Sequence, residues 1–239
     1  MSLSDQRVVI LGGTSGIGLA TADLATREGA EAVVVSSNPR SVERALASLP
    51  EGSTGEVADL TDVTQIAAVF DRIGSFDHLV YTAGEPLALM RLDALDIEAA
   101  MAFFTLRCFG ALGSVGAALP HLRPGGSVVL TSGTAALRAA PGWTVAAGVC
   151  GAVESMVRAM AVELAPLRVN AVRPGVVRSP LWSRMAEAER ERWYERTASG
   201  VPLGRVGEVV DVAEAYVFLM RQRHATGTVV TVDGGTLVA

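Results

Sequence analysis

A glycine-rich turn near the N-terminus constrains the fold of this chain more than any other feature. The short apolar run 7–11 leads directly into residues 12–18, and a segment with helical spacing follows up to residue 28. Gly12, Gly16 and Gly18 give the spacing G-x-x-x-G-x-G. Glycine suits a strand that bends sharply into a helix, and the first N–H groups of that helix attract phosphate. We predict a strand–turn–helix unit that binds a dinucleotide, and an ordinary glycine-rich turn is the alternative.

The rest of the chain alternates short apolar runs with segments of helical spacing. The runs that predict strands are residues 7–11, 32–35, 54–57, 79–81, 127–130, 168–172 and 228–232. The segments that predict helices are residues 17–28, 41–49, 62–73, 92–103, 106–122, 143–164, 187–196 and 208–220. This alternation predicts an α/β Rossmann fold, a doubly wound parallel sheet of seven strands with helices on both faces. In such sheets a ligand binds at the carboxyl ends of the strands.

Composition favours one globular domain over residues 1–239 and narrows the function. Half of the residues are hydrophobic, 19% are charged, and the net charge of −5 disfavours a nucleic-acid binder. The polar N-terminus lacks a signal-peptide core, and no uninterrupted apolar run is long enough to span a membrane. Two cysteines, Cys108 and Cys150, indicate no disulfide framework. We expect a cytoplasmic protein that binds a small-molecule substrate, with no nucleic acid, membrane or metal.

The segment after the second predicted strand bears on the choice of dinucleotide. Sites for NAD usually carry an acidic residue there, which holds the ribose 2′-hydroxyl. Here Ser36, Ser37, Asn38 and Arg40 stand in its place, and no carboxylate is present. Hydroxyl, amide and guanidinium groups suit a 2′-phosphate. The sequence therefore favours NADP over NAD, and the alternative for Arg40 is a solvated residue at the start of a helix.

Six motifs in order resemble those of the short-chain dehydrogenase/reductase family, across nearly the whole chain. They are residues 12–18, Asp59-Leu60, Tyr81-Thr82-Ala83-Gly84, the late strand and Pro-Gly turn of residues 168–175, Ser179-Pro180, and Val232-Asp233-Gly234-Gly235. The resemblance implies a nicotinamide cofactor and an oxidoreductase. The expected cofactor contacts are Gly12, Thr14, Ser15, Gly16, Ile17, Gly18, Ser37, Asn38, Arg40, Asp59, Leu60, Ala83, Gly84, Pro174, Gly175, Val177 and Ser179.

The catalytic positions of that family carry other residue types here. The family's Asn, Ser, Tyr and Lys align with Arg107, Gly133, Ala146 and Cys150, and the spacing from residue 133 to residue 146 agrees with the family pattern. No Y-x-x-x-K motif occurs anywhere in the chain. An acid/base contributes about 10²–10⁴-fold to a rate, whereas alignment of the reactants can contribute more, so a rewired reductase is compatible with these losses.

Replacement groups can be named from the sequence. Arg107 is a candidate for stabilising an oxyanion or binding an anionic substrate, with a structural ion pair as the alternative. Ser132 or Thr134 could donate to a carbonyl, whereas Tyr81 is more simply a core aromatic. We interpret Cys150 as a small, inert, buried thiol. The three histidines, His78, His121 and His224, are most simply surface residues.

Three functions follow from these residues. The first is an NADP(H)-dependent oxidoreductase acting on a small carbonyl or alcohol with a non-standard catalytic group. The second is an inactive NADP-binding sensor, scaffold or partner subunit, and the third is a lyase or isomerase. Segments 85–92, 134–144 and 180–201 are expected to line the substrate pocket, with an aromatic wall, and segment 185–196 to act as a lid. The aromatic residues expected in that wall are Trp143, Trp182, Trp193 and Tyr194. The resemblance also implies a homodimer or homotetramer through the two long helices.

Overall fold

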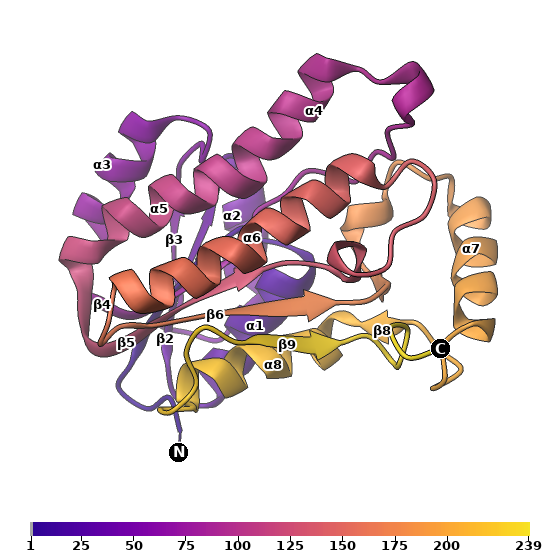
Figure 1. The fold of residues 1–239 in the computed structure, drawn as a ribbon. Helices are drawn as coiled ribbons and strands as arrows, with labels where there is room; N and C mark the ends of the chain where they lie inside the picture. Colours follow the sequence, from indigo (N-terminus) through magenta and orange to yellow (C-terminus); the bar gives the residue numbers. More distant parts are fainter. Residues whose placement is uncertain (1) are drawn as a thin grey trace.

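Seven parallel strands form the centre of the computed structural model, which describes residues 2–239 (Figure 1). The strands are β1 (Arg7–Leu11), β2 (Glu31–Ser36), β3 (Thr54–Val57), β4 (Phe76–Tyr81), β5 (Leu122–Thr131), β6 (Arg168–Pro174) and β9 (Val229–Val232). Their order across the sheet is β3-β2-β1-β4-β5-β6-β9. This confirms the predicted α/β Rossmann fold with a seven-stranded parallel sheet.

Helices cover both faces of the sheet (Figure 1). They are α1 (Gly16–Arg27), α2 (Pro39–Ser48), α3 (Val63–Ile73), α4 (Ile97–Phe104), α5 (Gly110–Ala118), α6 (Thr144–Glu163), α7 (Glu187–Ser199) and α8 (Val209–Arg221). Helices α3 to α6 lie over one face, and α1, α2 and α8 lie over the other. Because both faces are covered, the central strands contain runs of consecutive buried apolar residues, such as residues 8–11 of β1, and not only apolar residues at alternate positions.

Each face of the sheet has its own hydrophobic core. In β1, Val9 and Leu11 pack with Phe70 of α3, whereas Val8 and Ile10 pack with Tyr216 of α8. All six side chains are buried completely. The period of two along a strand places neighbouring residues in opposite cores, so β1 fixes the positions of both helical layers.

The two predicted helices of residues 92–103 and 106–122 form one continuous helical stretch instead. Helix α4 runs through a π-helical turn, Thr105–Phe109, directly into α5. The predicted break was wrong because no residue there stops a helix, and the chain keeps helical dihedral angles through Thr105 and Gly110. Turns of this kind often occur at functional sites, and this one contains Arg107.

Two short strands were not predicted. β7 (Val177–Arg178) pairs with β8 (Gly207–Glu208) in a separate two-stranded sheet. The pair lies beyond the carboxyl end of β6, where it joins the segment before α7 to the segment before α8. Strands of two residues have no readable period, so the sequence pattern could not show them.

Order in the sheet reverses between β1 and β4. From β1 the chain builds outward through β2 and β3, then returns to the other side of β1 with β4. The loops that leave β1 and β4 therefore diverge at the carboxyl edge, and a crevice opens between them.

Candidate active site

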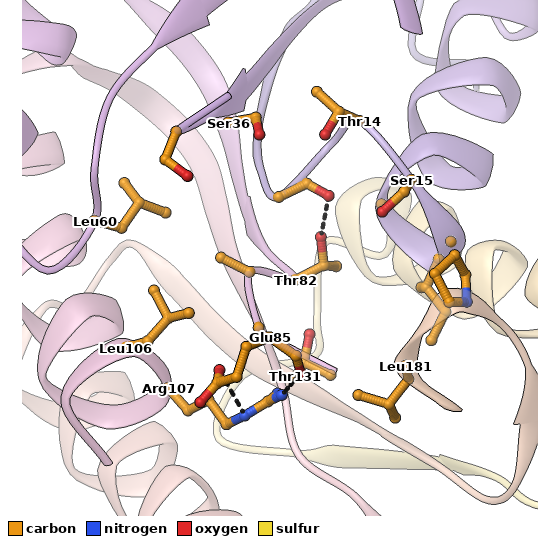
Figure 2. Close-up of a pocket in the computed structure, with 18 of the residues that line it drawn as sticks. Thr14, Ser15, Ser36, Leu60, Thr82, Glu85, Leu106, Arg107, Thr131 and Leu181 are labelled. Carbon is orange, nitrogen blue, oxygen red and sulfur yellow. Dashed lines mark hydrogen bonds and ion pairs between the residues drawn. The ribbon is translucent and has the colours of Figure 1, made fainter. Parts of the chain in front are cut away.

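A long groove of about 430 Å³ occupies that crevice. Its walls come from the turn between β1 and α1, the ends of β2, β3 and β4, the π-helical turn, and the loop after β7. Figure 2 shows Thr14 and Ser15 on one side of the groove, opposite Leu60 and Leu106. The groove lies where the sequence placed the dinucleotide.

The glycine turn fits a close approach between backbone segments. Gly12 has a φ of +83°, and a Cβ on it would lie 2.6 Å from the Cα of Ala83. A Cβ on Gly18 would lie 2.3 Å from the carbonyl oxygen of Gly12. Thr82 also donates to the Leu11 carbonyl at 3.1 Å and so ties the end of β4 to this turn. Only glycine allows the strand, the turn and the helix to approach this closely.

The start of α1 is left open toward the groove. Its N-cap residue, Ser15, makes no side-chain capping bond, and the first turn holds no acidic residue. By contrast Asn38, Asp62 and Asp96 use their side chains to cap α2, α3 and α4. The N–H groups of the first turn of α1 thus suit an external anion, as a pyrophosphate would be.

Most of the predicted dinucleotide contacts line this groove or the cavity beside it. Those in the groove are Gly12, Thr14, Ser15, Gly16, Ile17, Gly18, Ser37, Asp59, Leu60, Ala83, Gly84 and Ser179. Those in the adjoining cavity include Pro174, Gly175 and Val177. The agreement arises because these residues lie at or shortly after the carboxyl ends of the strands of the main sheet.

Asn38 and Arg40 do not line the groove. The Asn38 side chain accepts hydrogen bonds from the backbone N–H groups of Arg40 and Ser41, so it caps α2. The Arg40 side chain is exposed at the first turn of that helix, and no hydrogen bond joins its guanidinium to the described residues. The capping role was missed because Asn at a strand end suits a helix start as well as a ligand contact.

Sequence reasoning also missed several residues of the groove. These are Val35, Ala58, Thr61, Thr82, Leu106 and Thr131. The groove also contains Ser36, which was named for the 2′-phosphate, and five residues of the segments expected to line the substrate pocket, Glu85, Pro86, Pro180, Leu181 and Ser183. Most lie next to predicted contacts in the chain, so a wider window around each strand end would have found them.

A second, largely apolar cavity of about 150 Å³ adjoins the groove. The two share Ile17, Thr82, Ala83, Arg107, Thr131, Ser179 and Leu181. The four positions aligned with the family's catalytic residues, Arg107, Gly133, Ala146 and Cys150, all line this cavity. The alignment and the geometry therefore point to the same place.

Small side chains fill three of these four positions. A Cβ on Gly133 would lie 3.2 Å from the Sγ of Cys150, so the cysteine packs against the glycine. Burial raises the pKa of the Cys150 thiol to about 11, which keeps it protonated and agrees with an inert thiol. All 20 basic residues of the chain are arginines, so no lysine from another segment can enter this cavity.

Arg107 is the one charged residue among the described residues that line the cavity. Its Nη2 donates to the Glu85 carbonyl at 2.6 Å, and its Nε lies 3.5 Å from the Glu85 carboxylate (Figure 2). The guanidinium also lies over the ring of Phe103, 4.4 Å from the centroid. The structure therefore shows the ion pair, and it also places the side chain at the cleft; the role toward an oxyanion or anionic substrate stays a prediction.

Ser132 lies beside the cavity, but its hydroxyl is engaged elsewhere. It donates to the Glu154 carboxylate at 2.7 Å, and Arg173 donates to both oxygens of that carboxylate. Burial favours the neutral acid, but the hydrogen bonds from Arg173 and Ser132 outweigh it and hold the pKa of Glu154 below its usual value. In this geometry Ser132 joins β5 to α6 and does not offer its proton to a substrate carbonyl.

Tyr81 is a core residue, as expected. Its hydroxyl donates to the Leu106 carbonyl in the π-helical turn, and a Cβ on Gly110 would lie 2.7 Å from that hydroxyl. Burial raises the pKa of the Tyr81 phenol above its usual value. The side chain supports the turn that carries Arg107 rather than supplying a proton.

Only two of the four aromatic residues predicted for the pocket wall line the cavity. Trp143 and Trp182 line the cavity, with ring centroids 6.2 Å apart. Trp193 lies behind Trp182, with ring centroids 4.4 Å apart and planes tilted by 50°, and Tyr194 is the buried residue of α7. These last two residues support the wall from behind because they lie on the inner face of their helix and not at its end.

Comparison with known proteins agrees with this geometry. A family model described as Enoyl-(Acyl carrier protein) reductase matches residues 12–236. The short-chain dehydrogenase/reductase MalC of Malbranchea aurantiaca is 34% identical, over 99% of this chain and 96% of its own. FabG of Thermotoga maritima, a 3-oxoacyl-[acyl-carrier-protein] reductase, is 30% identical over 100% of both chains.

Solved structures give the same result. The MalC reductase/Diels-Alderase superposes with a TM-score of 0.92 at 30% identity, covering 99% of this chain and 98% of that one. A small-chain dehydrogenase in complex with NADPH has a TM-score of 0.86 at 32% identity, covering 98% and 99%. A short-chain oxidoreductase of Pseudomonas aeruginosa PAO1 with an atypical catalytic center has a TM-score of 0.90 at 29% identity, covering 98% of each chain. With its motifs, fold, groove and relatives in agreement, this chain belongs to the short-chain dehydrogenase/reductase family.

Proposed function

We propose that this protein is an NADP(H)-dependent oxidoreductase of a small carbonyl or alcohol, in which Arg107 takes the place of the usual catalytic group. The observation that carries the proposal is the position of Arg107 at the junction of the groove and the apolar cavity. A bound nicotinamide cofactor would supply or accept a hydride there. The chain's own contribution is to align the two reactants, exclude water, and place one positive charge beside the reacting oxygen.

The groove residues support the binding half of this proposal. The open N-terminus of α1 would hold the pyrophosphate, and Asp59 and Leu60 would flank the adenine. Ser179 lines both the groove and the cavity, where a nicotinamide amide would lie. A relative of known structure is in complex with NADPH, which supports the same cofactor here.

One relative supports a changed catalytic group. The Pseudomonas aeruginosa short-chain oxidoreductase is described as containing an atypical catalytic center. The alternative, an inactive NADP-binding protein, predicts cofactor binding without turnover. An isotope-transfer experiment distinguishes this alternative from an active enzyme.

The test combines cofactor binding with isotope transfer. Titration with NADPH should quench tryptophan fluorescence, and NADPH deuterated at C4 should pass deuterium to the product from a panel of carbonyl compounds. Binding without any transfer would favour the inactive alternative, and absence of binding would remove the oxidoreductase assignment.

Two variants of arginines on α2 test the preference for NADP over NAD. The exposed Arg40 side chain lies outside the groove in this structure and would turn toward the 2′-phosphate on binding. Arg40→Ala should then weaken NADPH at least tenfold and leave NADH unchanged, because a hydrogen bond to a charged group contributes about 1.5–3 kcal/mol. Arg44→Ala on the same helix, where the native side chain bonds to Ser41, should change neither affinity. Equal losses for NADPH and NADH in Arg40→Ala would contradict the preference for NADP.

We further propose a cytoplasmic homodimer or homotetramer. The continuous helical stretch Ile97–His121 and α6 are long and apolar enough to cross a membrane by length and composition, and only 39% of each apolar window is buried. Both lie against the sheet in this fold (Figure 1), so their outward faces suit another copy of the chain.

A further inference from the structure

We propose that a pocket at the amino-terminal edge of the sheet binds one phosphate group, held by Arg168 and Arg223. The pocket has a volume of about 420 Å³ and lies at the opposite edge from the groove. It is independent of the proposed oxidoreductase function. Three observations support a phosphate there: two arginines without an acidic partner, a surplus of positive charge, and hydrogen-bond donors that the fold leaves unused.

The pocket is formed by the starts of three strands and the end of one helix. Gln6 precedes β1, His78 lies in the first half of β4, and Arg168 is the first residue of β6. Arg221 ends α8, and Arg223 follows it by two residues. The N-terminus lies at this edge of the sheet in Figure 1. None of the residues that line this pocket also lines the groove or the apolar cavity.

Arg168 is a buried charge without a carboxylate partner among the described residues. Its side chain belongs to a residue that is 8% exposed. Its Nη1 donates to the carbonyls of Leu219 and Gln222 at 2.7 and 2.6 Å, and its Nη2 donates to that of Met220 at 2.9 Å. These carbonyls belong to the end of α8, where a helix dipole corresponds to about half a negative charge. Arg168 is therefore only partly compensated.

Arg223 adds a second positive charge beside Arg168. Burial, and then the charge of Arg223, lower the pKa of Arg168, so the two guanidiniums are close enough to repel each other. Arg223 is exposed and forms no ion pair within residues 2–239. Two neighbouring like charges without an acid are unfavourable, and an anion between them would remove the repulsion.

The other charged residues around the pocket neutralise one another. Asp77 is the one acidic residue among the described residues that line it. Its carboxylate accepts hydrogen bonds from the Arg7 backbone N–H at 2.8 Å and from Nη1 of Arg123 at 2.9 Å. Arg221 is paired with Glu28 at 2.7 Å. These two pairs thus add no net charge.

The remaining charge matches a phosphate group. His78 adds none at neutral pH, because burial, assisted by the charge of Arg168, lowers its pKa to about 4. Two positive charges, from Arg168 and Arg223, then face about half a negative charge from the helix end, which leaves a surplus of about 1.5. A phosphate ester carries about −1.5 to −2 at pH 7. A single carboxylate would leave part of the surplus uncompensated.

Unused hydrogen-bond donors are available to such an anion. Three of the five N–H groups of Arg168 donate to carbonyls of α8 and its cap, so two have no partner in the described chain. The Gln6 side chain accepts from the His78 ring at 3.1 Å through its oxygen, which leaves its N–H groups for a ligand. Guanidinium groups match the spacing of phosphate oxygens.

A titration with inorganic phosphate, followed by NMR of the histidine rings, locates the site. Of the three histidines, only His78 lines the pocket, so its ring signals should shift and saturate while those of His121 stay in place. Arg168 also holds the end of α8, so Arg223 is the better residue to change. Arg223→Glu should keep the fold and weaken phosphate binding at least tenfold, as expected for a lost hydrogen bond between charged groups.

Arg192→Glu is the matched control. It makes the same change of net charge at an exposed arginine of α7 that does not line the pocket, so its affinity for phosphate should equal that of the native protein. Equal losses in Arg192→Glu and Arg223→Glu would show a general effect of charge and overturn the proposal. So would unmoved His78 signals, or undiminished binding to Arg223→Glu, which would place the phosphate elsewhere.

Calorimetry with three anions identifies the chemistry and its source. Inorganic phosphate and glycerol 3-phosphate should both bind, and tighter binding of the ester would point to a phosphorylated metabolite rather than free phosphate. Succinate, whose two charges lie at opposite ends, should bind at least tenfold more weakly than phosphate. Equal affinities for succinate and phosphate would overturn the assignment to phosphate. All of these measurements can be made without cofactor, so they leave the oxidoreductase assignment unaffected.

Discussion

At the scale of single residues, His78 is a polar residue in the interior of the protein and is 1% exposed. The surface position expected for it was therefore wrong. It lies in β4, with its two ring nitrogens 2.8 Å from the Ser127 hydroxyl and 3.1 Å from the Gln6 amide oxygen. Strands β1 and β5 flank β4, so a polar residue near its start is covered on both sides.

This burial predicts an acid-sensitive stability. Burial, assisted by the charge of Arg168, lowers the pKa of His78 to about 4 from an ordinary value near 6.5. Between these values the unfolded chain binds a proton that the folded chain does not. The free energy of unfolding should therefore fall as the pH drops from about 6.5 toward 4, by up to about 3 kcal/mol.

Urea denaturation at a series of pH values measures this effect. His78→Asn removes the titrating group, so its unfolding free energy should depend less on pH across that window. His224→Gln, at an exposed histidine, serves as the control and should follow the native profile. Identical profiles for the native protein and His78→Asn would contradict the assignment.

At the scale of elements, the turn between β1 and α1 and the π-helical turn between α4 and α5 position the site. The first depends on glycine, and the second places Arg107 opposite the glycine turn across the groove. The sequence identified the first because glycine spacing is a local signal. It could not identify the second, because Thr105 and Gly110 keep helical dihedral angles and no turn residue marks where the hydrogen-bond pattern changes.

Two glycines with positive φ allow a matched test of the turn between β1 and α1. Gly12 and Gly52 both have positive φ, +83° and +92°, but only Gly12 has neighbours where a Cβ would lie. Gly52→Ala should cost about 1 kcal/mol of unfolding free energy from backbone strain alone. Gly12→Ala should cost clearly more, because its Cβ would meet Ala83, and should also weaken NADPH binding at least tenfold.

Thermal or urea unfolding and an NADPH titration provide the two measurements. Gly52 lies outside the groove, so the affinity of Gly52→Ala for NADPH should equal that of the native protein. Equal losses of stability and affinity in the two variants would show that the close packing at Gly12 does not matter.

At the scale of the whole molecule, the outer face of the Ile97–His121 stretch exposes several large apolar side chains. Met101, Phe109 and Leu112 are 64%, 65% and 47% exposed along it. Apolar side chains repeated along one helical face usually meet another apolar surface. A two-fold symmetric contact between copies of the chain would bury this face on both partners at once.

Light scattering after size exclusion tests this contact. The native protein should have at least twice the chain mass of 24.8 kDa. The double variant Met101→Glu/Leu112→Glu should shift toward the monomer with an unchanged circular-dichroism spectrum. Val63→Glu, a 72% exposed position at the start of α3, should keep the native mass. A monomeric native protein would contradict the proposed assembly.

The sequence by itself determined the parallel sheet, the strand–helix alternation and most of the groove. These follow from short-range signals: apolar runs, helical spacing, and glycines next to strand ends such as Gly12 and Gly18. The catalytic alignment at Arg107, Gly133, Ala146 and Cys150 also came from linear spacing, and the structure brings those four residues into one cavity.

Tertiary structure alone decided which polar side chains are available. Ser132 is engaged with Glu154, Asn38 caps a helix, and His78 is buried. Each outcome depends on a partner or a covering strand brought close by folding, and Ser132 and Glu154 lie 22 residues apart. A one-dimensional pattern fixes the direction of a side chain within its own element, but its hydrogen-bond partner is fixed only when elements pack together.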